Sequence, residues 1–178
     1  MGWVVKVAII AVESEGEAQL LRLQLENLGF AVCLRRVMRP TTFLASFDFF
    51  GQPADVAIVC ARGDPAGLVF PALPPGSDTL VLPGDRMGAE ILAGHLREMP
   101  PVVVMTGAET GRKDFARAFL AAGAKAYVAP DLDPDPASAL VLVTLAAYRV
   151  ASAGTSWEAA VRTANNFFTL ENRWSVWR

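Results

Sequence analysis

The sequence predicts an α/β protein in which a mostly parallel central sheet lies between two layers of helices, a three-layer sandwich. Short, nearly continuous apolar runs recur along the chain, as is typical of strands buried on both faces. Segments with helical spacing of apolar residues lie between these runs, and such alternation favours parallel strands joined by helices. Of the 178 residues, 53% are hydrophobic and only 19% are charged, which suits elements buried on more than one side.

The first half of the chain begins with a strand and a helix. Residues 4–12 (VVKVAIIAV) form a largely β-branched run and predict a buried strand. Ser14 is placed to cap the following helix, where Glu15 and Glu17 suit the positive end of the dipole. Gly29 is expected to end that helix. The next predicted elements are a strand over 30–34, a short aromatic-rich helix over 41–49 and a buried strand over 55–60 (DVAIVC).

The second half contains a predicted hairpin and a regular alternation of elements. Glycine and proline are frequent between residues 62 and 84, and the apolar runs 68–70 and 79–82 predict a small hairpin there. The later predicted elements are helix 88–96, strand 101–105, helix 114–122, strand 126–128, helix 137–152 and helix 157–168, the last capped by Thr155 or Ser156. With no repeat and no long linker, we expect one domain over residues 1–178, with a Trp-rich tail over 169–178.

Composition restricts the possible chemistry. The chain has 16 basic and 18 acidic residues and a pI near 5.4, which argues against a nucleic-acid partner. His95 is the only histidine, so a multi-histidine metal site is excluded, and we expect neither a metal nor a cofactor. Cys33 and Cys60 lie in apolar runs, as buried reduced thiols of a cytoplasmic protein do. No apolar run is long and uninterrupted enough to span a membrane.

The candidate functional segments follow the third and fourth predicted strands. They read ARGDPAGLV at residues 61–69 and MTGAETG at residues 105–111. Loops at the carboxyl ends of parallel strands carry the functional groups of such sheets, so we expect these two to open side by side. Neither fits a phosphate-binding P-loop, and the chain has no G-x-S-x-G nucleophile motif.

These segments resemble the caspase-like CHAT domains, relatives of caspases and gingipains. In that family the third-strand loop carries a His-Gly pair with the general base, and the fourth-strand loop carries the nucleophile in a pattern like Ala-Cys-x-Thr-Gly. Here Arg62-Gly63 stands at the first place and Ala108 at the cysteine. The similarity extends over residues 54–164, and more loosely over 4–30. It implies a caspase-like fold in which both dyad positions are substituted.

Those substitutions remove the peptidase chemistry. Alanine at position 108 has no nucleophilic atom, and the guanidinium of Arg62 stays protonated at physiological pH, so it cannot act as a base. Cys60 lies on a predicted strand and His95 on a predicted helix, so we do not expect them to form a replacement pair. The resemblance therefore implies an inactive pseudopeptidase that serves as a binding or regulatory module, although an enzyme of another type using the same strand-end cleft stays open.

A receiver-like signalling domain is a further alternative. Residues 4–30 and 101–130 also resemble the receiver domains of response regulators, with Thr106 at the position of a switch threonine. A receiver needs a phosphoacceptor aspartate at the end of its third strand, where this chain has Cys60. It also needs a lysine where this chain has Ala129. Phosphoryl transfer is therefore not expected.

The candidate binding residues lie in the strand-end loops and in an acidic, proline-rich segment (PDLDPDP). They are Arg62, Gly63, Asp64, Gly107, Glu109, Thr110, Asp131 and Asp133. Arg62 either binds a ligand carboxylate or forms an ion pair with Asp64 or Glu109 that stabilises its loop. The acidic segment either shapes recognition or is a solvated loop that starts a helix at Asp135 or Pro136.

The expected partner is a protein or a peptide. Trp174 and Trp177, flanked by basic residues, have the character of interface anchors, so the tail is a candidate surface for a partner or for a homo-oligomer. The alternative is that one of these indoles packs back on its own domain.

Overall fold

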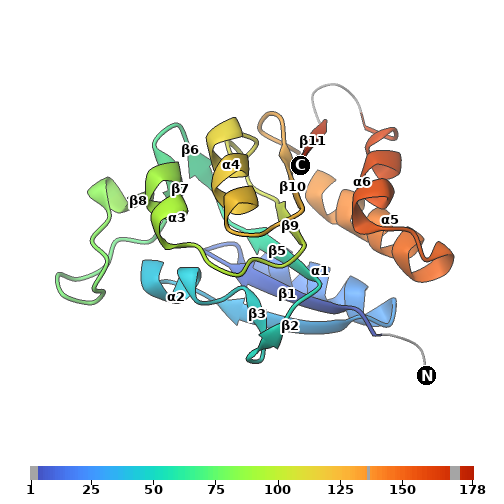
Figure 1. Cartoon of the computed structure of the whole chain (residues 1–178), viewed down its shortest axis with the longest axis horizontal. Helices are drawn as coiled ribbons and strands as arrows, with labels where there is room; N and C mark the ends of the chain where they lie inside the picture. Colours follow the sequence, from blue (N-terminus) through green and yellow to red (C-terminus); the bar gives the residue numbers. More distant parts are fainter. Residues whose placement is uncertain (1–3, 136, 169–172) are drawn as a thin grey trace.

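A six-stranded sheet organises the molecule (Figure 1). The structure is a computed structural model that describes residues 4–135, 137–168 and 173–178. Five strands are parallel and the sixth, at one edge, is antiparallel. In sheet order the strands are β11 (Trp174–Trp177), β10 (Ala126–Pro130), β9 (Val102–Met105), β5 (Val56–Cys60), β1 (Lys6–Ala11) and β2 (Ala31–Arg36).

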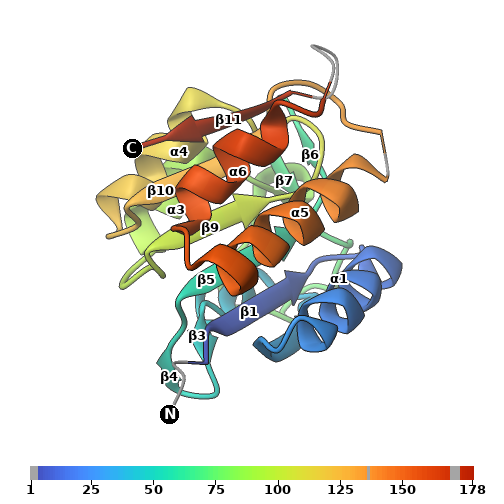
Figure 2. The same cartoon turned by 90° about the vertical axis from the view of Figure 1, so that its right-hand side faces the viewer.

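Helices cover both faces of this sheet, which confirms the predicted mostly parallel α/β architecture. One layer consists of α1 (Glu15–Asn27), α5 (Ser138–Ala153) and α6 (Trp157–Asn165) (Figure 2). The other consists of α2 (Pro40–Leu44), α3 (Ala89–His95) and α4 (Lys113–Ala121). Alternate strand residues supply the two cores. Ile9 faces the first layer and Ile10 the second, as the period-two pattern of a strand requires.

The chain changes its direction of winding between β1 and β5. From β1 it goes first to β2 on one side and later to β5 on the other side. The loops after β1 and β5 therefore separate at the carboxyl edge, which is where ligands bind in open α/β sheets. No helix within the described residues has the length and apolar character needed to cross a membrane.

The predicted helix over residues 41–49 is wrong beyond its first turn. The helix α2 ends at Leu44, and β3 (Asp48–Phe49) pairs with β4 (Gln52–Pro53) in a small hairpin. The Asp48 carboxylate accepts a hydrogen bond from the Gly51 amide, and Gly51 has a φ of +78°. This side chain–backbone turn competes with helical hydrogen bonding, so the aromatic spacing did not decide the local structure.

The predicted hairpin between residues 68–70 and 79–82 is also wrong in its pairing. The strand β7 (Gly67–Val69) pairs with β6 (Gly63–Asp64) on one side and β8 (Arg86–Met87) on the other. Residues 79–82 form no strand, and Val81 is 84% exposed. A 3₁₀ turn, η1 (Pro83–Asp85), follows them. The apolar character of the segment 79–82 was therefore not a strand signal.

The helix caps follow the sequence only in part. Ser156 caps α6, because its hydroxyl accepts a hydrogen bond of 3.2 Å from the Ala159 amide. Gly154, with a φ of +62°, ends α5. The side-chain cap expected from Ser14 is absent in α1, where the Ser14 hydroxyl accepts no capping hydrogen bond.

The Trp-rich tail folds back on the domain within its described part, residues 173–178. Trp174 is 1% exposed, and the Trp177 ring packs on Tyr127 with 5.7 Å between the centroids. The alternative that one indole packs back on its own domain is confirmed for Trp174, which belongs to the core between the sheet and its helices and is therefore not an interface anchor. A homo-oligomer through this tail stays a prediction. Residues 169–172 and Pro136 lie outside the described residues.

Candidate functional site

A cavity of about 380 Å³ opens at the carboxyl end of the parallel strands. Its walls come from the loops after β1, β5 and β9 and from the segment that leads into α5. The lining residues are Glu13, Ser14, Glu15, Gly16, Glu17, Arg62, Gly63, Thr106, Gly107, Ala108, Asp133, Pro134, Asp135 and Ala139. The cavity thus lies at the switch point of the sheet, and its volume is in the lower part of the roughly 300–1,000 Å³ range of ligand sites.

The loops that carry Arg62 and Ala108 are direct neighbours, as the sequence predicted. The Gly63 amide donates a hydrogen bond of 3.1 Å to the Ala108 carbonyl. A Cβ built on Gly107 lies 1.7 Å from the carbonyl oxygen of Ala61 and 3.1 Å from the Cα of Arg62. This approach is possible only because position 107 has no side chain. The two loops therefore form one continuous wall of the cavity.

Two arginines hold the β6–β7 hairpin beside this wall. Arg86 forms an ion pair with Asp64, whose other oxygen accepts hydrogen bonds from the Ala66 and Gly67 amides. Arg112, at the start of α4, donates to the Pro65 carbonyl and forms a bidentate pair with Asp114 at 3.1 and 2.6 Å. Each guanidinium thus joins separate parts of the chain with charge-assisted hydrogen bonds.

Arg62 itself is exposed and, among the described residues, forms no ion pair. The expected partners are wrong for physical reasons. Asp64 pairs with Arg86 instead. Glu109 lies in a turn with a φ of +56°, and its exposed side chain makes no ion pair within the described structure. The guanidinium of Arg62 therefore remains available on the cavity wall.

The carboxylates at the start of α1 are the part of the site that the sequence did not identify. Glu13, Glu15 and Glu17 line the cavity, whereas the sequence placed Glu15 and Glu17 at the positive end of the helix dipole and assigned none of the three to binding. Burial raises the pKa of the Glu17 carboxyl, and a hydrogen bond from the Thr106 hydroxyl partly offsets that effect. The sequence signal for these residues was their position. The three carboxylates alternate directly after a buried strand, where the functional loops of such a sheet begin.

Four of the eight candidate binding residues line the cavity and four do not. Arg62, Gly63, Gly107 and Asp133 line it, and Asp64, Glu109, Thr110 and Asp131 lie outside its lining. The buried Thr110 has a structural part instead: its hydroxyl donates to the Gly107 carbonyl at 2.6 Å, and its own carbonyl accepts from the Tyr127 hydroxyl at 2.7 Å. The Asp131 amide bonds to the Arg173 carbonyl at 2.9 Å, which aligns the acidic segment with the tail.

Cys60 and His95 do not form a replacement dyad. Cys60 is fully buried at the end of β5, in the core on the α1 side of the sheet, and burial strongly raises the pKa of its thiol. His95 is exposed at the end of α3, which covers the opposite face, and a ring nitrogen contacts the Ile91 carbonyl at 2.9 Å. Across the described residues, no cluster of three histidine, cysteine or acidic side chains is placed to hold a metal ion.

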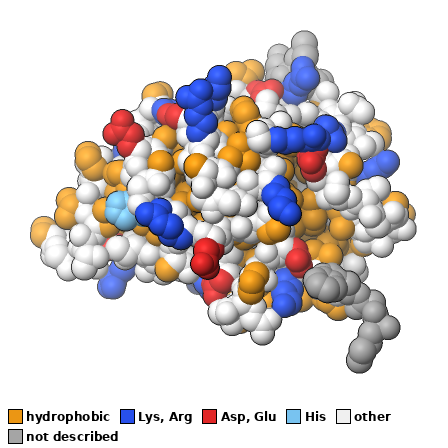
Figure 3. Space-filling view, viewed as in Figure 1, with side chains coloured by type: hydrophobic (Ala, Val, Ile, Leu, Met, Phe, Trp, Pro, Cys, Tyr) orange, Lys and Arg blue, Asp and Glu red, His pale blue; other side chains and the backbone are white. Residues whose placement is uncertain are grey.

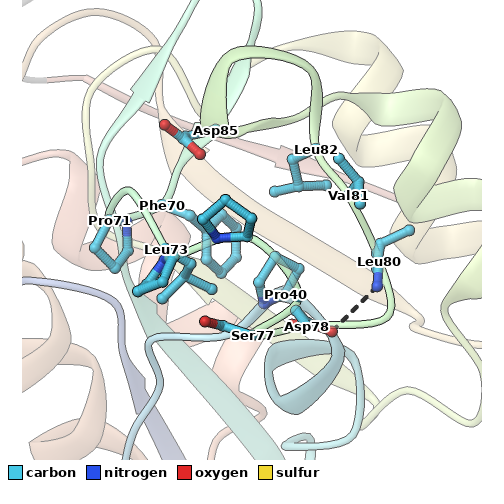
Figure 4. Close-up of a pocket in the computed structure, with 13 residues that line it drawn as sticks. Pro40, Phe70, Pro71, Leu73, Ser77, Asp78, Leu80, Val81, Leu82 and Asp85 are labelled. Carbon is cyan, nitrogen blue, oxygen red and sulfur yellow. Dashed lines mark hydrogen bonds between the residues drawn. The ribbon is translucent and has the colours of Figure 1, made fainter.

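A second, smaller cavity of about 100 Å³ lies beside the loop between β7 and η1 (Figure 4). Its walls are Phe70, Pro40 and the proline-rich segment 71–82. The Asp78 carboxylate accepts hydrogen bonds of 3.1 Å from the Thr41 and Leu80 amides, so it fixes the loop against α2. The lining is mostly apolar.

Basic side chains do not gather into a patch on the face drawn in Figure 3, where they are separated by neutral and apolar surface. That distribution suits the small net charge of −2. The clearest concentration of charge in the described structure is instead the acidic wall of the strand-end cavity.

No protein-family model matches the chain, and no curated protein matches its sequence significantly. Among solved structures, the fold is similar to that of the Arg-specific cysteine proteinase gingipain R, with a TM-score of 0.59 and 10% sequence identity. The match covers 98% of this chain and 46% of the gingipain chain, so the chain spans less than half of that protein. At this identity the similarity shows the fold alone, a caspase-like cysteine peptidase fold.

Two flavodoxins also match over a smaller part of the chain. One is from Streptococcus pneumonia TIGR4, with 24% identity and a TM-score of 0.34. The other is a short-chain flavodoxin associated with a bacterial microcompartment, with 20% identity and a TM-score of 0.37. Each match covers 68% of this chain and 78% of the flavodoxin. TM-scores this low carry no argument about fold or function.

Proposed function

We propose that the chain is a catalytically inactive, caspase-like module related to CHAT domains, and that it binds a peptide segment of a partner protein in the strand-end cavity. The proposal takes residues 1–178 as one domain. One observation carries it: Arg62 and Ala108 occupy adjoining loops on the wall of a cavity at the carboxyl edge of the sheet. The cleft is thus retained where the resemblance places a base and a nucleophile, while both reactive groups are missing.

Inactivity follows from the residues at the two positions where the resemblance places the reactive groups. Covalent peptide cleavage needs a nucleophile and a base within hydrogen-bond reach of each other. The methyl group of Ala108 supplies no nucleophile, and the guanidinium of Arg62 accepts no proton. The thiol of Cys60 is fully buried, and its raised pKa keeps it protonated at neutral pH.

The charges of the cavity favour a cationic side chain in the bound peptide. Five carboxylates line it, those of Glu13, Glu15, Glu17, Asp133 and Asp135, and the guanidinium of Arg62 is the one basic group in the lining. Glu15 is already paired with Arg36 outside the lining, so the excess of negative charge rests on the other four. A site with this excess of negative charge attracts arginine or lysine and repels acidic residues. A volume of about 380 Å³ is small for a peptide, so most of the segment lies outside the cavity.

Binding to matched peptides tests the proposal. Fluorescein-labelled hexapeptides that carry one arginine, lysine or glutamate are titrated with the protein and followed by anisotropy. We expect the arginine and lysine peptides to bind and the glutamate peptide not to bind. Glu17→Gln and Asp133→Asn should each weaken binding about threefold to tenfold, and Glu90→Gln on α3 is the control that leaves binding unchanged.

Two results contradict the proposal. One is a failure of the arginine and lysine peptides to bind the folded protein, whether the C-terminus of the peptide is a free carboxylate or a carboxamide. The other is hydrolysis of the arginine or lysine peptide by the purified chain, detected by mass spectrometry. Hydrolysis would show that the cavity contains reactive groups other than the two substituted positions.

A further inference from the structure

Arg62 is the one basic side chain in the lining of an otherwise acidic cavity. Its guanidinium forms no ion pair among the described residues, although five carboxylates line the same cavity. The β6–β7 hairpin next to it is held by Arg86 and Arg112, so Arg62 is not needed for that task. The guanidinium is exposed and has no ion-pair partner among the described residues, so its donors are accessible to a ligand in the cavity.

A basic side chain alone leaves Arg62, one part of this lining, without a complement. Arg62 would repel the charge of an arginine or lysine side chain, and its own donors would remain without an anionic acceptor. The peptide carbonyl of a continuous chain is neutral and gives a weaker hydrogen bond than a carboxylate does. The combination of carboxylates with one free guanidinium is complementary to a group that carries both charges.

We infer that the cavity recognises a chain terminus, namely a C-terminal arginine or lysine with its free α-carboxylate. The inference rests on the proposed function, since it specifies which peptide the same cavity takes. The basic side chain lies toward the carboxylates at the start of α1, and the α-carboxylate pairs with Arg62. Arg62 is therefore the residue that distinguishes a chain end from an internal segment.

The small residues beside Arg62 suit this arrangement. Gly63, Gly107 and Ala108 line the cavity together with Arg62, so this part of the wall carries no other large side chain. Guanidinium binds a carboxylate through two parallel hydrogen bonds, which a lysine at the same position cannot do.

The experiment compares two peptides that differ only at the C-terminus. Both are fluorescein-labelled hexapeptides ending in arginine, one with a free carboxylate and one with a carboxamide. For the full chain we expect the free acid to bind about fivefold to tenfold more tightly than the amide, the range of a charged hydrogen-bonded pair at a partly exposed site. In Arg62→Gln this preference should disappear, while the amide binds as before or more tightly.

Two further variants separate recognition from general effects. Arg62→Lys retains the charge but not the planar fork, so we expect it to recover only part of the preference. Arg117→Ala removes an exposed guanidinium from α4, on the other face of the sheet, and should leave both affinities unchanged.

The failure of this inference differs from the failure of the proposed function. Equal affinity of the acid and the amide for the full chain, or a preference that survives in Arg62→Gln, overturns terminus recognition and leaves peptide binding intact. Binding of neither peptide overturns both, because the cavity then takes no basic peptide.

Discussion

Gly107 lies against Ala61 so closely that a Cβ at position 107 would be 1.7 Å from the Ala61 carbonyl oxygen. The contact joins the loop after β9 to the loop after β5 and is made by backbone on both sides. Neither loop can yield easily, because the Gly63 amide also bonds to the Ala108 carbonyl at 3.1 Å. The width of the cavity between Arg62 and Ala108 therefore depends on the absence of one methyl group.

Gly107→Ala should destabilise the protein and alter the cavity. We expect a loss of about 3 kcal/mol in the free energy of unfolding, since the added methyl must displace backbone rather than a flexible side chain. Urea denaturation followed by circular dichroism measures the loss. Gly94→Ala in α3 is the matched control, because a Cβ there meets no atom within 4 Å, and it should be neutral or slightly stabilising. Equal stability of the two variants would contradict the backbone contact.

Arg112 should control the order of the β6–β7 hairpin. It donates to the Pro65 carbonyl and pairs with Asp114, so Arg112→Ala removes the tie between the hairpin and α4. Because the side chain is about one-third exposed, we expect only about 1 kcal/mol of destabilisation. Hydrogen exchange at the Ala66 and Gly67 amides should speed up about fivefold. If exchange there matches that of an Arg117→Ala control, Arg112 is not the anchor.

The sequence predicted the parallel sheet well because its signal is local. Residues 56–60 of β5 are all buried, and an unbroken apolar run of that length is what a strand covered on both faces requires. The placement of the loops at Arg62 and Ala108 side by side follows from the parallel sheet. Strand order alone brings the carboxyl ends of β5 and β9 together.

The parts that were missed depend on contacts between distant residues. The apolar run that contains Thr79 and Leu80 forms no strand. Instead, β7 pairs with β8, which follows the turn η1. The ion pair of Asp64 with Arg86 depends on β8 lying next to β7, and it removes the partner expected for Arg62. The burial of Glu17 beside Thr106 likewise exists only once α1 lies next to the end of β9.

Glu17 should make the stability depend on pH in a direction unusual for a carboxylate. Its pKa in the folded protein is raised, chiefly by burial, so the folded state holds this proton more tightly than the unfolded chain. The resulting stabilisation is complete below the unfolded pKa, near 4.5, and is lost as the pH rises through the folded pKa. Glu17→Gln should therefore raise the free energy of unfolding at pH 7 and change it much less at pH 4.

Urea titrations at the two pH values measure this difference, with Glu90→Gln on the surface of α3 as the control that shows no such change. A Glu17→Gln variant that is less stable than the wild type at pH 7 would contradict the burial of an ionised carboxyl. The same variant weakens peptide binding in the proposed function, so a gain in stability with a loss of affinity would identify Glu17 as a binding residue rather than a structural one.

Asn165 should hold the antiparallel edge strand in place. Its side chain accepts a hydrogen bond of 3.0 Å from the Trp174 amide and donates one of 2.5 Å to the Trp174 carbonyl, as a neighbouring strand would. Asn165→Ala leaves both backbone groups without these partners at a residue that is 1% exposed, so we expect a loss of about 2 kcal/mol. Asn165→Asp keeps the acceptor but loses the donor, and it should lose stability because a carboxylate then faces the Trp174 carbonyl.

Two measurements check this effect. Chemical denaturation gives the loss of stability, and the fluorescence of the buried indoles reports whether β11 separates from the domain. Asn166→Ala, one residue beyond the end of α6, is the matched control and should leave both signals unchanged. If Asn165→Ala and Asn166→Ala behave alike, the edge strand is held by the packing of Trp174 and Trp177 alone. The hydrogen bonds from α6 would then contribute little to the closure of the sheet.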